Sequence, residues 1–330
     1  MSHNLNIVGG KARMMYAGEP PWHGMGTRLE NPATSAEAIV AAGLDWAVRM
    51  VPLFAIEGTG VVPAPSHFAV VPDDRWGQPD CPVFGVVGKD YLPLQNREAF
   101  EFFDSIVGQG RAMYHTAGAL GQGEHVWILA KLPGQIEVTP SDFLDKYVLL
   151  STGHDGRTAF RMLLTPVRVV CQNTLIMALE AGKEIARAHH VPGMGRQLQS
   201  TRAALQALLS GFTSLEAAFR TMAARKLNAM EAQQYVTRVF PAPVGVPEDK
   251  IPRWITEDRA NCVHLYRYGI GNDDPAVKET LWAAYNGITE YVDHWRTRGN
   301  TAHMYNVCFG RGQQIKAAAL NQSLQLIGTA

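Results

Sequence analysis

The sequence predicts an α+β protein, in which an antiparallel sheet with β-hairpins and packing helices precedes a mainly helical C-terminal half. Up to about residue 190, short runs of β-branched and aromatic residues alternate with Gly, Pro and Asp clusters. After Pro192 the chain becomes rich in Ala, Leu, Gln, Arg and Glu. The expected divisions are an irregular N-terminal arm at 1–33, an α+β core at 34–190 and a helical region at 191–330.

A helix is predicted to follow Thr34, because Thr34-Ser35-Ala36-Glu37 has the form of a capping box and Gly43 is a natural helix end. Three short strands are expected next, at 46–55, 67–71 and 83–87. Pro52 interrupts the first of them, and a proline inside a strand is typical of an edge or a bulge.

The middle of the chain predicts one packing helix and two hairpins. Residues 97–107 place Phe100, Phe103 and Ile106 at helical spacing. The first hairpin is expected from 111–118 and 124–132, with a linker through Pro133 and Pro140 after it. The second joins 147–151 to 158–164 around His154-Asp155-Gly156-Arg157, because Asp-Gly is among the strongest hairpin signals.

Helical periodicity predicts the remaining elements. Leu281, Tyr285, Ile288, Val292 and Trp295 form an apolar stripe at spacings of three and four. The other helices are expected at 173–182, 196–209, 214–226, 229–239 and 312–327, with a four-proline loop from Pro241 to Pro252.

Composition limits the class of partner. Thirty Lys and Arg balance thirty Asp and Glu over 330 residues, so attraction to nucleic acid or membrane must come from a local basic surface. The four scattered cysteines form no C-x-x-C pair, which favours reduced thiols. No signal-peptide or membrane-spanning run is found, so we expect the protein in the cytoplasm of a host bacterium.

Several motifs that could indicate a catalytic or metal site are better explained by turn geometry or core packing. The segment Trp22-His23-Gly24-Met25-Gly26 lacks the Lys-Ser/Thr of a phosphate loop and is interpreted as a docking arm. His154 and Asp155 lie at a turn, Cys171 lies in an apolar run, and His189-His190 are adjacent rather than four apart. We therefore expect no catalytic residue, metal or cofactor.

A row of basic residues is the stronger functional candidate. Arg157 leaves the second hairpin turn, Arg161 follows four residues later on the same strand face, and Arg168 lies just beyond. Arg111 and Lys131 are expected on the same sheet, beside Tyr114 and Trp127. Such a row can follow a phosphate backbone while aromatic rings contact bases, although an ion-paired, solvated sheet face has the same pattern. Gln172 follows an apolar run, has no capping role of its own, and joins this candidate set.

Six segments together resemble a phage/plasmid-like protein family of unassigned function, found on bacteriophage, plasmid and integrated-element genomes. They are PWHGMG from residue 21, GLDW at 43–46, FGVVGKDYLPLQNREAFEFFD at 84–104, HDGRTAFRMLLTPVRVVCQNTL at 154–175, WAAYNGITEYVDHWR at 282–296 and CFGRGQQIKAAAL at 308–320. The resemblance implies a mobile-element setting but supplies no catalytic residues. The order of strands, hairpins and helix is also similar to single-strand annealing proteins, a fold-level analogy that implies rings or filaments around single-stranded DNA.

The leading hypothesis is a non-enzymatic protein that binds or anneals single-stranded nucleic acid in phage or plasmid replication or recombination. In it, Arg157, Arg161, Arg168 and Lys131 contact phosphates, Trp127 or Tyr114 stacks on bases, and the protein is a homo-oligomer. One alternative is a structural or anti-defence factor whose helical half docks a phage or host protein. A second is a metal-dependent nucleic-acid enzyme using His154 or Asp155.

Overall fold

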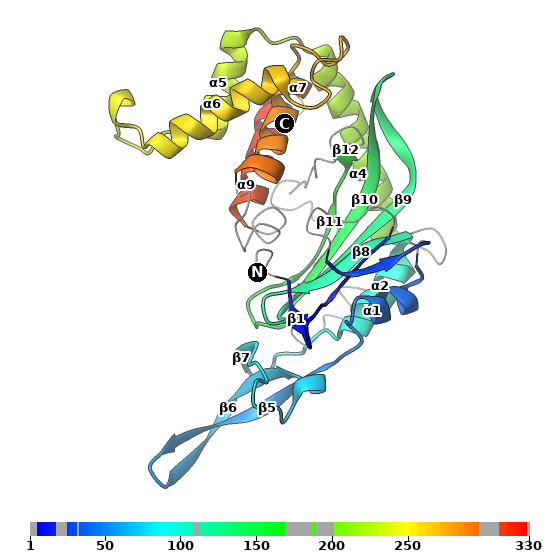
Figure 1. Ribbon diagram of the computed structural model, residues 1–330, viewed down its shortest axis with the longest axis vertical. Coiled ribbons are helices and arrows are strands. Elements are labelled where there is room, and N and C mark those ends of the chain that lie inside the picture. The colour runs from blue at the N-terminus through cyan, green and yellow to red at the C-terminus, as the bar shows by residue number, and fades with distance from the viewer. Residues whose placement is uncertain are drawn as a thin grey trace.

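A computed structural model shows the α+β architecture that the sequence predicts, with most helices in the C-terminal half (Figure 1). It describes residues 5–17, 25–31, 33–107, 113–168, 186–188, 190, 201–296 and 310–328. Within these residues, no helix is long and apolar enough to cross a membrane.

The central element is an eight-stranded sheet in the order β13-β11-β10-β9-β8-β3-β4, with β12 also paired to β10. Its strands are β3 (Met14–Ala17), β4 (Thr27–Leu29), β8 (Met113–Leu120), β9 (His125–Thr139), β10 (Asp142–Gly153), β11 (Phe160–Leu164), β12 (Val167–Arg168) and β13 (Ala186–Ala188). All neighbours are antiparallel except β3 and β4.

The N-terminal segment is more ordered than predicted. Residues 1–33 were expected to be irregular, but β3 pairs with β8 and its four residues are all buried. A small hairpin of β1 (Ile7–Val8) and β2 (Lys11–Ala12) precedes it. Without an apolar period in this Gly-rich stretch, only long-range pairing with β8 reveals the strand.

The two hairpins of the core are present, but the expected linker between them is not. The predicted break at Pro133 and Pro140 is wrong, because β9 runs on to Thr139 and pairs with β10 from Asp142. A register shift between Asp145 and Tyr147 accommodates the irregular pairing. The result is a long two-stranded ribbon that extends beyond the rest of the sheet (Figure 1).

One face of the sheet packs on helices. The predicted helix after Thr34 is α1 (Ser35–Ala41), with its capping box formed, and the next is α2 (Asn96–Val107). Because side chains alternate along a strand, Val126, Ile128 and Ala130 of β9 join the large core with these helices. The opposite face carries a second, small cluster of Leu5, Met14, Leu120, Trp127 and Leu149.

A separate three-stranded sheet projects from the body (Figure 1). It contains β5 (Val48–Glu57), β6 (Gly60–Pro72) and β7 (Gly85–Gly88) in that order, with the short 3₁₀ turn η1 (Asp73–Arg75) after β6. The register of β5 and β6 shifts between Pro52 and Leu53, which confirms the predicted irregularity at this proline.

The C-terminal half is helical, although two of its boundaries were not predicted. The expected break between 196–209 and 214–226 is wrong, since α4 is continuous, and α6 was not anticipated after the proline loop. The expected helix at 173–182 lies outside the described residues. The helices are α4 (Thr201–Ala224), α5 (Ala229–Val239), the 3₁₀ turn η2 (Glu248–Lys250), α6 (Arg253–Tyr268), α7 (Leu281–Glu290), the π-helical turn η3 (Tyr291–Trp295) and α9 (Arg311–Ile327).

Candidate nucleic-acid interface

Two of the predicted basic residues meet at the end of the β10–β11 hairpin. Arg157 and Arg161 both line a hollow of about 140 Å³ that is completed by His125. The remaining lining residues are Val126, Ser151, Thr152 and Thr158. Pockets for drug-sized ligands are about 300–1,000 Å³, so this hollow fits a small group such as a phosphate rather than a whole nucleotide.

The hairpin turn is held by its own aspartate. The carboxylate of Asp155 accepts from the amides of Arg157 and Thr158, at 2.9 and 2.7 Å, and from the Thr158 hydroxyl at 2.9 Å. Partial burial opposes ionisation of Asp155, but these hydrogen bonds outweigh it and keep the pKa of the carboxyl below its usual value. Gly156 has φ of +74°, a conformation that glycine adopts at little cost.

Two guanidinium groups line the hollow. Arg157 is exposed, Arg161 is half-buried, and no carboxylate is among the lining residues. The carboxylate of Asp155 lies 4.0 Å from His125 Nε2, which partly offsets the two guanidinium groups. This arrangement suits an anion with several acceptor oxygens, because each guanidinium group has several donors.

His154, by contrast, is a core residue. Its ring lies between Trp46 and Phe84, at centroid distances of 5.6 and 6.1 Å, and it is fully buried. Its Nε2 lies 3.0 Å from Asn96 Oδ1. The Asn96 amide nitrogen already donates to Leu44 and Trp46, so Oδ1 is the acceptor and His154 donates. Burial, with a smaller effect of His190, lowers the pKa of His154 to about 3, so the ring is neutral.

Lys131 does not join the two arginines. Its ammonium group lies 2.7 Å from the Asp145 carboxylate and over the ring of Tyr147. Lys131 pairs with Tyr147 in the sheet, four residues along β10 from the Ser151 that faces Arg161. Lys131 therefore shares the sheet face of Arg161 but is already neutralised by a carboxylate.

The two predicted stacking residues are buried. Tyr114 is 1% exposed, lies against Phe100 and Phe103 of α2, and donates to the Asp104 carboxylate. Trp127 is 3% exposed and belongs to the small cluster on the opposite face. The expectation that either ring stacks on a base is therefore wrong for this structure, because neither ring face is accessible.

The remaining predicted site residues are placed only in part. Arg168 pairs with Leu144, far along β10 from Ser151, and its side chain lies outside the described residues. Arg111 and Gln172 lie wholly outside them, as do Trp22, Cys171 and His189. Arg157 and Arg161 are thus the two members of the predicted basic row that lie together in the described part of the structure.

A larger hollow of about 520 Å³ lies beside α1 and the β1–β2 hairpin. It is lined by both signs of charge, with Lys11 and Arg13 facing Asp45 and Asp74. Arg13 forms an ion pair with Asp74 and lies over the ring of Trp46. Because these charges are matched internally, the hollow is a weaker anion site than the arginine pocket.

The buried ion pairs in the helical half were not predicted from the sequence. Lys316 of α9 is fully buried and lies 2.6 Å from Asp293 of η3. Asp258 of α6 accepts from Tyr291 and forms an ion pair with Arg296. The sequence signal for the Lys316 pair was an acidic residue, Asp293, next to Val292 of the apolar stripe. Among the described residues, no group of three or more His, Cys, Asp or Glu is arranged to hold a metal.

A family model described as a domain of unknown function, DUF932, matches residues 83–324. The chain belongs to the DUF932 family. No curated protein and no solved structure matches it. The DUF932 match includes Arg157, Arg161 and the helical half, but β5 and β6 lie before its first residue.

Proposed function

We propose that this DUF932 protein binds or anneals single-stranded nucleic acid without catalysis, and that Arg157 and Arg161 receive a backbone phosphate. The supporting observation is the convergence of these two side chains on one hollow with His125. A setting in phage or plasmid replication or recombination is part of the proposal and rests on the resemblance of the six segments quoted above.

The proposed attraction to nucleic acid comes from one local site rather than from the net charge of the molecule. The whole chain has no net charge, so long-range attraction to nucleic acid is weak. Two guanidinium groups in a small hollow can form paired hydrogen bonds with one phosphate. Since Tyr114 and Trp127 are buried, phosphate contacts rather than base stacking carry the proposed binding.

Electrophoretic mobility shifts with labelled single-stranded DNA and RNA at about 50 and 200 mM salt test the proposal. The unmodified protein should bind more weakly at the higher salt, because phosphate contacts release counterions. The double variant Arg157→Ala/Arg161→Ala should lower affinity and flatten the slope of log K against log salt by about 0.7, because both side chains contact the same phosphate. Oligonucleotide length and sequence should have little influence on this change.

Arg238→Ala is a matched control, since Arg238 is an exposed arginine of α5 away from the hollow. It should leave both affinity and slope unchanged. Absence of salt-sensitive binding by the unmodified protein would refute nucleic-acid binding. Equal losses in the double variant and the control would refute the assignment of the site.

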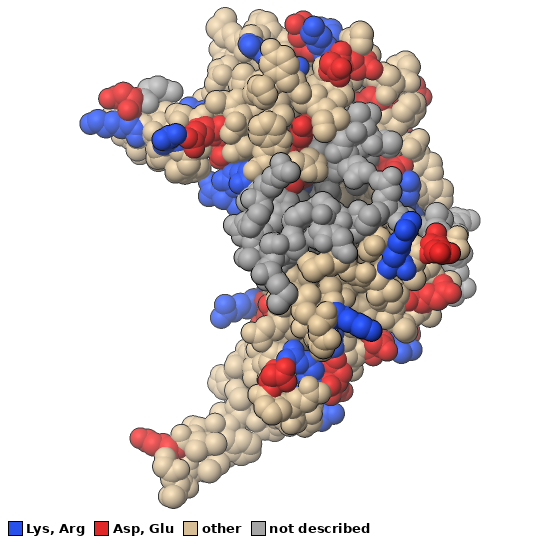
Figure 2. Space-filling view, in the orientation of Figure 1, with Lys and Arg blue, Asp and Glu red and all other residues tan. Residues whose placement is uncertain are grey.

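A second candidate function is protein interaction, favoured by the apolar β5–β6 ribbon that extends into solvent (Figure 2). In that case the protein is a structural or anti-defence factor that docks a phage or host protein. Light scattering with a pull-down from infected and uninfected cells separates the two: an annealing protein forms large homo-oligomers, whereas such a factor forms a defined hetero-complex.

A further inference from the structure

The outer part of the β5–β6 ribbon, residues 53–64 and called the arm here, is apolar on both faces. Phe54 lies opposite Pro63, and Ile56 lies opposite Val61, so these four share one face. The other face carries Leu53, Ala55, Val62 and Ala64. The exposed fractions of Phe54, Ile56, Val61 and Val62 are 54, 72, 60 and 62%.

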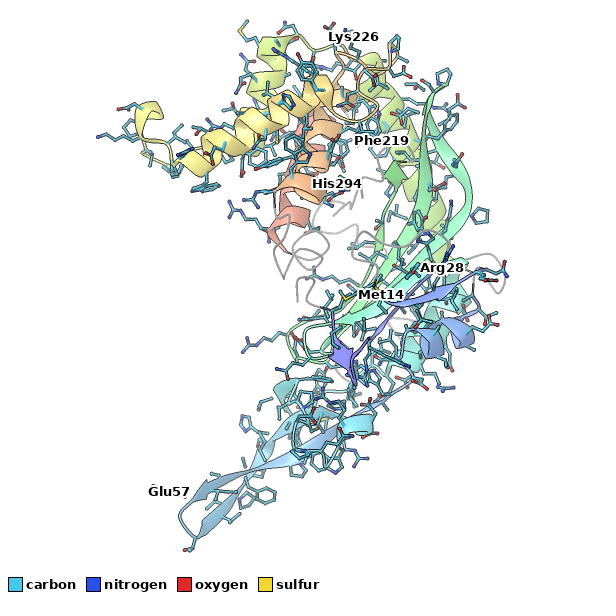
Figure 3. All side chains as sticks on the ribbon, in the orientation of Figure 1. Met14, Arg28, Glu57, Phe219, Lys226 and His294 are labelled. Atoms are coloured by element: carbon cyan, nitrogen blue, oxygen red, sulfur yellow. The ribbon has the colours of Figure 1, made fainter. Side chains whose placement is uncertain are left out.

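Such a ribbon is incomplete by itself. An isolated two-stranded hairpin is marginally stable in water, and contiguous exposed apolar surface marks interaction sites. Figure 2 shows the arm extending from the body with uncharged atoms along its length and an acidic group at its tip. That group is Glu57, labelled in Figure 3, and it is the sole Asp, Glu, Lys or Arg between residues 50 and 72.

One edge of the arm, that of β6, is protected against addition of a further strand. β7 pairs with β6 over residues 67–70, so within the described residues no strand covers the outer edge of β6 at the arm. Pro63 and Pro65 lie on this edge segment and lack amide hydrogens. Prolines on an edge disfavour addition of a further strand, so side-chain packing is favoured over strand addition on the β6 side of the arm.

A second surface with exposed aromatic rings, called the aromatic cluster here, lies in the helical half. The ring of His264 lies 5.0 Å from that of Tyr268 and 6.1 Å from that of Trp295, measured between centroids. Tyr268 is 71% exposed and Trp295 is 47% exposed. Arg267 is exposed next to Tyr268 on α6 and gives this surface a positive charge.

The arm lies at the lower end of the molecule in Figures 1 and 3, whereas α6 lies in its upper part and His294 of η3 lies well above the arm. Separation in a projection is a lower limit on separation in space. The arm of one chain therefore contacts an aromatic cluster only in another chain. β5 has 10 residues, so at about 3.3 Å per residue it is about 33 Å long.

We propose that the arm of one copy packs on the aromatic cluster of a second copy, so that copies join head to tail. Phe54 and Ile56 cover Tyr268 and Trp295, and Glu57 pairs with Arg267. The two surfaces are different patches of the same chain, so the contact is heterologous and repeats to form a ring or a filament. It does not depend on nucleic-acid binding, and its test contains no nucleic acid.

The experiment measures mass by size-exclusion chromatography with light scattering, at several concentrations in the micromolar range. The unmodified chain should form species of several copies. An arm variant, Phe54→Asp/Ile56→Asp, and a cluster variant, Tyr268→Glu/Trp295→Ala, should each be monomeric. Val244→Asp, which changes a fully exposed valine of the proline loop, should keep the mass of the unmodified chain.

Mixing the arm variant with the cluster variant gives the deciding result. The first retains its aromatic cluster and the second retains its arm, so an equimolar mixture should form a one-to-one dimer and nothing larger. Circular dichroism of both variants should match the unmodified chain, which separates loss of contact from loss of folding. If a variant is unfolded, the single changes Ile56→Asp and Tyr268→Glu replace it in the same mixture.

Three results would overturn the proposal. They are a monomeric unmodified chain at all concentrations, folded variants that keep the full mass, and a mixture that stays monomeric. Arm variants that are monomeric while cluster variants still assemble would point instead to arm-to-arm contact, which the proposal excludes.

Discussion

The chain contains two hairpins that end in opposite ways. The β10–β11 turn is packed and polar: Asp155 binds its backbone, His154 is buried against Trp46, and Arg157 lines a pocket. The arm is exposed and apolar, with Glu57 at its tip. The difference teaches that polar residues at a turn can be structural, while apolar residues in a strand can be available for binding.

The largest expected difference in stability comes from the two histidines associated with these hairpins. His154→Ala removes a fully buried ring and leaves the Asn96 oxygen without its donor. We expect a loss of about 3 kcal/mol in the free energy of unfolding, from the cavity and the unsatisfied acceptor. Urea denaturation measures it.

His67→Ala is the matched change in β6, where the side chain is exposed. Surface substitutions usually change stability by less than about 0.5 kcal/mol, which is the expected result here. Equal losses at the two positions would mean that the packed character of the β10–β11 turn has been overstated.

The burial of His154 should also make the stability of the protein depend on pH. The pKa of His154 is about 3 in the folded chain, against an ordinary value of 6.5. Below pH 6.5 the unfolded chain therefore binds a proton that the folded chain does not, and stability falls as the pH is lowered towards 3. The slope from this residue is at most about 1.4 kcal/mol per pH unit. Denaturation midpoints between pH 7 and 4.5 should show it, and a pH-independent midpoint would contradict it.

The next largest difference in stability is expected between the acidic residues of the two turns, Asp155 and Glu57. Asp155→Ala removes an acceptor from two amides and one hydroxyl, so we expect a loss of about 2 kcal/mol. Glu57→Ala should lie within about 0.5 kcal/mol of the unmodified chain, as for other exposed positions. Thermal and urea unfolding of both variants at neutral pH measure these changes in the free energy of unfolding. A larger effect at Glu57 would show that the arm tip is held within the monomer.

The two turn glycines give the smallest expected difference between the hairpins. Gly58 and Gly156 have φ of +57° and +74°, so alanine is strained at both. A Cβ atom at Gly58 meets nothing within 4 Å, whereas at Gly156 it would lie 2.5 Å from Val87 Cγ1. We expect Gly58→Ala to cost about 1 kcal/mol and Gly156→Ala about 1 kcal/mol more. Reversal of this order in urea denaturation would contradict the packing of the turn on β7.

The sequence by itself determined the local elements with strong local causes. The capping box at Thr34 forms, Pro52 coincides with a register shift, and Asp155-Gly156 makes a hairpin turn. These features depend on backbone conformation and hydrogen bonds within a few residues, so neighbouring sequence suffices to predict them.

Only the tertiary structure decided which residues share a surface. Tyr114 and Trp127 belong to neighbouring strands, yet they lie in cores on opposite faces of the sheet. Lys131 lies on the face of Arg161 but is paired with Asp145. The physical reason is that register and the packing of distant elements set burial and charge partners, and no local pattern encodes them. For the same reason only residues 53–55 of the arm were predicted as strand, and both its second strand and its two exposed faces became visible only in the folded chain.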